Sequence, residues 1–194
     1  VLIFIFLILI NLSFVSAPHT VTTSAGATSY NINEDTVYVF NITINNTDVG
    51  NPANITQVNI TLPSGFTFAA QSNGTNALNS PIVFSNTATV LTWTNTIYHV
   101  INGSVNGTNF WFNISAATPG NYNITVTTLN TTGLYYFNSN ISIRVNDTTP
   151  PNVTFINPVN NGNYSGSIVL NVSVNDSFSE GSSAVDSVYF NLTN

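Results

Sequence analysis

The chain has 194 residues, enough for one domain of roughly 100–150 residues and part of another. Only 4% of its residues are charged, the net charge is -6, and Arg144 is the single basic side chain. Binding to nucleic acid or to an anionic membrane surface needs several cations on one face, so both are excluded as partners. The absence of cysteine excludes disulfides, thiol catalysis and thiolate metal sites, and stability must come mainly from the core.

The first residues have the pattern of an export signal. Residues 1–10 are unbroken apolar, and the small residues that follow end at Ala17, before Pro18. This pattern predicts a signal peptide over 1–17 with its charged n-region missing, so the reading frame is expected to begin upstream. The end of a membrane anchor, a pilin-like helix and a buried strand remain as alternatives. Export predicts an extracellular or cell-surface location, with membrane attachment only through an anchor outside this sequence.

Alternation of apolar and polar residues dominates positions 18–147. A period of two indicates half-buried strands, and the alternation predicts them near 36–45, 58–62, 91–94, 110–115, 122–127 and 137–145. Asn-Gly pairs and prolines separate these runs at short intervals, which is typical of tight turns between antiparallel strands. The sequence predicts no helix here. The predicted fold is an all-β, antiparallel sandwich, with an inter-sheet core of Phe40, Trp93, Phe110, Phe112 and Tyr122.

Four segments of this region resemble the Ig-like repeat domains of bacterial and archaeal surface proteins: 41–45, 59–68, 90–93 and 119–125. The resemblance implies an Ig-like β-sandwich with a stalk or spacer role.

Residues 148–151, Thr-Thr-Pro-Pro, form a predicted linker, because two prolines fix φ and stiffen the chain. Further strand-like runs follow, at Val153 and Phe155, over 168–174 and over 188–192. Together with the turn at 158–162, they resemble the bacterial Ig-like domain of secreted adhesins and exported enzymes. The stretch 152–194 is short for such a module, so we expect a truncated second Ig-like domain with an exposed edge and a partly uncovered apolar face.

Asn-x-Ser/Thr triplets recur far more often than random order would give. They predict N-glycosylation outside the cell, although a strand whose outer face is Asn and Thr also produces such triplets by its period of two. Triplets in turns are the better acceptors, and the candidate sites are Asn73, Asn102, Asn106, Asn130, Asn146 and Asn163.

The sequence gives little support for a metal site or for a hydrolase active site. Calcium could use Asp147, Asp176, Glu180 and Asp186, but their spacing matches no calcium loop, and turn-forming or solvated carboxylates explain them better. A copper site on His19 and His99 would need cleavage after Pro18, a poor signal-peptidase site. Glu34 and Asp35 are adjacent and would point to opposite faces, unlike a glycosidase pair. No Ser-His-Asp set has a nucleophile elbow.

We therefore expect no enzyme activity, no catalytic residues and no metal or cofactor. The predicted function is an extracellular structural or spacer module in a tandem Ig-like array of the adhesin or surface-layer type. The alternative is an accessory or carbohydrate-binding module of a larger secreted enzyme, with Trp111 as the ligand-stacking aromatic. Other surface proteins or glycans are the expected partners, and the sequence leaves the oligomeric state open.

Overall fold

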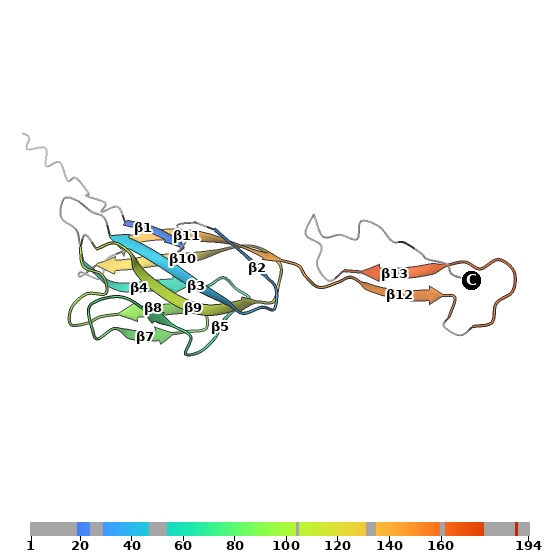
Figure 1. The fold of residues 1–194 in the computed structure, drawn as a ribbon, viewed down its shortest axis with the longest axis horizontal. Helices are drawn as coiled ribbons and strands as arrows, with labels where there is room; N and C mark the ends of the chain where they lie inside the picture. The colour runs from blue at the N-terminus through green and yellow to red at the C-terminus, as the bar shows by residue number, and fades with distance from the viewer. Residues whose placement is uncertain are drawn as a thin grey trace, which may run out of the picture.

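The computed structural model describes residues 19–23, 29–46, 54–103, 105–130, 135–159, 162–176 and 189. These residues form strands, turns and loops, and no helix occurs among them. The predicted signal peptide, the run at 188–192 (Tyr189 apart) and the residues Glu180 and Asp186 lie outside the described residues. Figure 1 shows two layers of strands joined by a short segment to a separate two-stranded hairpin.

The first layer is a five-stranded sheet in which β9 is central. The strand order is β1-β3-β9-β5, and β6 also pairs with β9. The bounds are β1 (His19–Thr23), β3 (Tyr38–Asn46), β5 (Phe66–Phe68), β6 (Gly74–Thr75) and β9 (Thr108–Ala116).

The second layer is a six-stranded sheet with the order β2-β11-β10-β4-β8-β7. Most of its pairs are antiparallel, but β2 runs parallel to β11, a pairing that the alternation pattern did not predict. The bounds are β2 (Ser29–Asn33), β4 (Ile55–Thr61), β7 (Val83–Asn86), β8 (Val90–Thr94), β10 (Gly120–Asn130) and β11 (Tyr135–Asn146).

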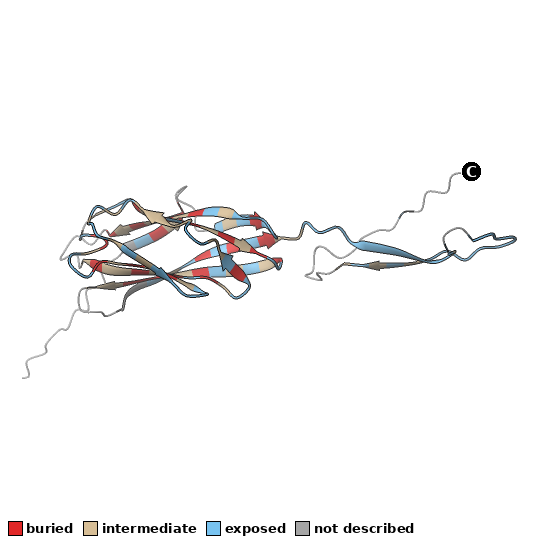
Figure 2. Ribbon diagram, turned by 90° about the horizontal axis from the view of Figure 1, so that it is seen from below, coloured by how far each residue is buried: buried red, intermediate tan, exposed pale blue. Residues whose placement is uncertain are grey.

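The core lies between these two sheets, and its buried residues are coloured red in Figure 2. Trp93, Phe40, Phe110 and Phe112 are almost completely buried, as predicted. Their rings contact one another across the layers: the Trp93 and Phe110 ring centroids lie 5.3 Å apart, and those of Phe40 and Phe112 lie 5.9 Å apart. Tyr122 is only half-buried and packs at the margin against Phe66. The predicted all-β sandwich is thereby confirmed.

The six predicted strands of this region correspond to β3, β4, β8, β9, β10 and β11. The alternation pattern did not predict β1, β2 and β7, and it did not mark β5 and β6 as strands. These elements have two to five residues each, too few for a clear period. Most lie at or near the margins of the sheets, where one side of a strand lacks a partner and its alternation weakens.

The hairpin consists of β12 (Asn152–Asn157) and β13 (Asn171–Asn175). Every residue of β12 is exposed, and Figure 2 colours this part mostly pale blue. The strand predicted from position 168 begins only at Asn171, because β12 ends opposite that residue and offers 168–170 no partner.

Candidate functional site

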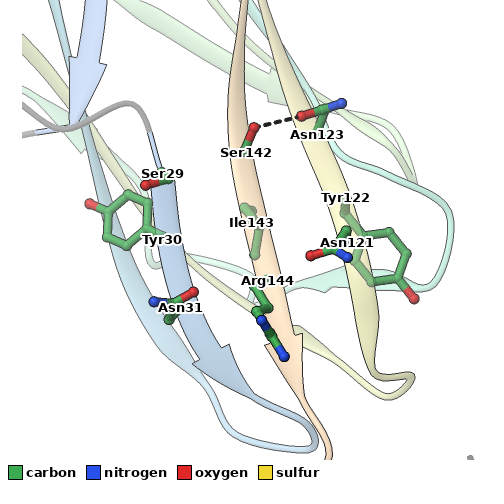
Figure 3. Close-up of a pocket in the computed structure, with 9 residues that line it drawn as sticks. All are labelled: Ser29, Tyr30, Asn31, Asn121, Tyr122, Asn123, Ser142, Ile143 and Arg144. Atoms are coloured by element: carbon green, nitrogen blue, oxygen red, sulfur yellow. Dashed lines mark hydrogen bonds between the residues drawn. The ribbon is translucent and has the colours of Figure 1, made fainter. Parts of the chain in front are cut away.

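A shallow hollow lies on the outer face of the six-stranded sheet, over β2, β11 and β10 (Figure 3). Its volume is about 370 Å³, within the usual range for small-ligand sites. Residues that alternate along a strand share one face, so two residues from each strand point outward here. The six outward side chains are Ser29, Asn31, Asn121, Asn123, Ser142 and Arg144.

Register places these side chains in two rows. Arg144 lies opposite Asn31 on one neighbouring strand and opposite Asn121 on the other. In the second row, Ser142 lies opposite Ser29 and Asn123, and its hydroxyl donates to Asn123 Oδ1 at 3.1 Å. The floor is closed from below by Tyr30, Tyr122 and Ile143, whose side chains face the core. The hollow therefore has two rows of polar side chains at its surface and apolar and aromatic side chains beneath them.

Arg144 is the only cation of the chain, and its guanidinium lies between Asn31 and Asn121 in Figure 3. Among the described residues, no carboxylate forms an ion pair with it. The hollow therefore offers one fixed positive charge surrounded by groups that both donate and accept hydrogen bonds. Sequence reasoning noted Arg144 only as a lone charge, because nothing local showed which neighbours the parallel β2–β11 pairing would bring to it.

Trp111 lies on the outer face of the other sheet, in β9, with 37% of its surface exposed. It is paired with Gly74 of β6 and with Asn41 of β3. A methyl group placed on Gly74 would overlap the indole ring, so the ring lies directly over the Gly74 backbone. The ring face on the Gly74 side is therefore occupied, and only the remaining indole surface is open to a stacking ligand.

The candidate glycosylation sites differ in accessibility. Asn102, Asn106 and Asn163 are exposed, whereas Asn73, Asn130 and Asn146 are half-buried. The Asn102 amide oxygen accepts from Asn79 at 2.6 Å. The Asn146 amide nitrogen, the atom a glycan would join, donates instead to Asn33 Oδ1 at 3.3 Å. Asn102, Asn106 and Asn163 are therefore exposed acceptors, whereas the amide nitrogen of Asn146 is bound to Asn33.

Glu34 occupies the end of the sandwich from which the linker leaves. Its carboxylate is nearly buried, and its Oε1 accepts from the Thr148 amide at 2.9 Å and from the Thr149 amide at 2.8 Å. The Thr149 hydroxyl donates to the same oxygen at 2.6 Å. The Thr149 hydroxyl bond and the Thr148 amide bond outweigh burial and lower the pKa of Glu34. We call this contact set, Glu34 with Thr148 and Thr149, the Glu34 clasp.

The acids weighed for calcium do not converge in the described part of the chain. Asp147 Oδ1 accepts from the Thr149 amide at 3.0 Å, a turn-forming contact of the kind predicted for it. No group of three or more His, Cys, Asp or Glu that could hold a metal occurs within the described ranges. Asp35, adjacent to Glu34, is exposed in the turn with φ of 53°. His99 is half-buried, and the His19 side chain lies outside the described residues.

No described segment forms a helix of the length and apolar character needed to cross a bilayer.

No protein-family model and no curated protein sequence matches the chain. Solved structures with a similar fold include a Corynebacterium diphtheriae protein described as membrane anchored, at 8% identity and a TM-score of 0.51. That match covers 66% of this chain and 35% of the other.

Two further matches have a TM-score of 0.47. The major pilin subunit of Bacillus cereus shares 10% identity over 70% of this chain and 41% of its own. The N-terminal domain of a Streptococcus gordonii adhesin shares 8% identity over 66% of this chain and 32% of its own. The chain spans less than two thirds of the length of each of these proteins. At 8% identity, the likeness to the Corynebacterium diphtheriae protein shows the fold alone.

Proposed function

We propose that this chain is a non-catalytic, extracellular structural module of a cell-surface or secreted protein, of the adhesin or surface-layer type. The observation that carries this proposal is the Glu34 clasp, which ties the segment after the last strand of the sandwich to the sandwich itself. The mechanism is mechanical and steric: the module holds neighbouring parts of its protein at a set distance and direction.

A spacer module sets the direction of the next segment only if the linker that follows it has a fixed conformation. The Glu34 amide donates to the Asn146 carbonyl at 3.0 Å, so the clasp begins at the end of β11. The three bonds to the carboxylate then hold Thr148 and Thr149. The next two residues, Pro150 and Pro151, each have φ fixed by their own ring. The stretch from Asn146 to Pro151 therefore contains little rotational freedom.

Residues 152–194 are proposed to belong to a second Ig-like module. The β12–β13 hairpin supports this, because it is an antiparallel strand pair and, in the described part of this stretch, two strands alone do not bury an apolar layer. Phe155 is 62% exposed and Val169 is 71% exposed, as expected for apolar side chains that a second sheet would cover. Limited proteolysis of the full chain tests this: cleavage is expected after Pro150 first, and equal resistance on both sides of Pro150 would contradict it.

Location is tested on intact cells of the native host with an antibody against the sandwich. Surface labelling without permeabilisation supports the proposal, as does removal of the epitope by external protease. Labelling that requires permeabilisation contradicts it. Mass analysis of the protein from the same cells tests the proposed glycosylation, since an intact mass equal to the bare polypeptide would disprove it.

The second candidate function is a carbohydrate-binding or accessory module of a secreted enzyme, favoured by the exposed part of Trp111. Its test is a glycan array with the wild-type chain and Trp111→Ala. Glycan binding that Trp111→Ala abolishes would favour the carbohydrate-binding function. Equal results for the wild-type chain and Trp111→Ala would favour the spacer function.

A further inference from the structure

We propose that the hollow around Arg144 binds a carboxylated saccharide, of the uronic acid class, through its carboxylate and ring hydroxyls. The site is separate from Trp111, because Arg144 belongs to the six-stranded sheet and Trp111 to the five-stranded one. The proposal does not depend on the spacer function, since it rests on the outer face of the sandwich and not on the linker.

Arg144 carries the charge at an interior position of its sheet. Exposed cations in β-proteins often stand on edge strands, where they prevent pairing with other chains. Arg144 stands on β11, which has β2 on one side and β10 on the other, so it has no edge to protect. Nor does it serve an ion pair with any described carboxylate, although the chain carries seven acids. Its guanidinium is therefore available to an external anion.

The side chains around Arg144 suit a ligand with both a carboxylate and hydroxyl groups. Arginine presents a planar fork that matches a carboxylate with two parallel hydrogen bonds. Each sugar hydroxyl both donates and accepts, and the Asn and Ser side chains around Arg144 do the same. Asn31 and Asn121 flank the charge, and in the next row the Asn123 amide oxygen accepts from the Ser142 hydroxyl. A simple inorganic anion would use the guanidinium but leave these amides unused.

The dimensions of the hollow also suit a saccharide. Side chains on neighbouring strands stand about 4.8 Å apart, and those two residues apart on one strand about 6.6 Å. The two rows therefore span about 10 Å by 7 Å, the footprint of one to two sugar rings lying flat on the sheet. An acidic peptide would need either a second cation or an apolar pocket for its side chains, and the hollow has neither.

The experiment is a titration of the ¹⁵N-labelled full chain, produced without glycosylation, followed by amide chemical shifts. The probes are a galacturonic acid trimer, the neutral galactose trimer, and sodium acetate and sodium sulfate at equal ionic strength. We expect the acidic trimer to shift amides at 29–31, 121–123 and 142–144. We also expect the neutral trimer and the simple anions to bind at least about tenfold more weakly.

Three variants sharpen the result. Arg144→Gln removes the charge and is expected to weaken binding of the acidic trimer about tenfold. Arg144→Lys is expected to keep only part of the wild-type affinity, because lysine lacks the planar fork of arginine. Trp111→Ala, on the other sheet, should bind as wild type. The amide spectrum of each variant shows that the sandwich is folded. Equal binding by Arg144→Gln, shifts centred elsewhere, or equal affinity for acetate and the acidic trimer would each overturn the proposal.

Discussion

The Thr149 hydroxyl donates to the Glu34 carboxylate at 2.6 Å, although 115 positions separate the two residues in the chain. The Thr148 and Thr149 amides donate to the same oxygen, so one acidic side chain at the end of β2 holds the first residues of the linker. Charge-assisted hydrogen bonds are stronger than neutral ones, so this contact orders the first residues of an otherwise extended segment.

Removing the clasp should release the linker without unfolding the sandwich. In Glu34→Ala, the Thr148 and Thr149 amides lose their acceptor, and we expect their hydrogen-exchange protection to fall about tenfold, equivalent to about 1.4 kcal/mol. Core amides such as that of Phe112 should keep theirs. Glu34→Gln retains an oxygen acceptor without the charge and should give an intermediate value. Unchanged protection in Glu34→Ala would contradict the role of the clasp.

Acid should weaken the same contact. The pKa of Glu34 is held below its ordinary value of 4.5, chiefly by the Thr149 hydroxyl and the Thr148 amide. Because the folded-state pKa is the lower one, the contribution of Glu34 to stability is complete above the unfolded-state pKa and disappears as pH falls through the folded value. Denaturant unfolding of wild type and Glu34→Gln across pH 2–6 measures this. Their difference should shrink toward the acid end, and a constant difference would count against it.

The inter-sheet core should be the main source of stability. Phe112 is fully buried and its ring stacks on Phe40, 5.9 Å away. Phe112→Ala removes a large side chain and leaves a cavity, at an expected cost of about 3–5 kcal/mol in the free energy of unfolding. The control is Val39→Ala, whose side chain is 66% exposed and should change stability by about 0.5 kcal/mol or less. Similar losses in both variants would show that the core is not where the structure places it.

Two glycines should respond to alanine for different reasons. At Gly74 the new methyl group would overlap the Trp111 ring, so the ring must move. At Gly65 there is open space but φ is 85°, which strains alanine by about 1–2 kcal/mol. We expect both variants to lose stability, but only Gly74→Ala to shift the fluorescence of Trp111, measured in a Trp93→Phe background. A fluorescence change in Gly65→Ala alone would refute the assigned Trp111 contact.

Glycan occupancy should follow accessibility if the native host modifies this chain. Peptide mapping of the protein from that host should find Asn102, Asn106 and Asn163 occupied more often than Asn146, whose amide nitrogen is bound to Asn33. Asn41, inside β3 between β1 and β9, serves as the comparison for triplets produced by strand periodicity alone. Preferential modification of Asn41 or Asn146 would argue that accessibility in the folded chain does not govern these sites.

The alternation of residue types was enough to predict the longer strands and their buried faces. Ile42, Ile60 and Ile124 each sit at an apolar position of a period of two, and each is completely buried. The same periodicity predicts Trp93 and Phe110 in the core without reference to strand pairing. Neither β2 nor its parallel pairing with β11 followed from this pattern, because a five-residue strand has few alternations and strand order is not a local property.

What the sequence determined by itself was therefore the fold class, the core and the polar character of the outer faces, because side chains alternate across a strand. The tertiary structure alone decided which polar residues became neighbours. Asn33 and Asn146 pair across 113 positions, and the same parallel register brings Asn31 to Arg144 and the linker to Glu34. Such contacts depend on which strands are neighbours and on their register, and local periodicity predicts neither.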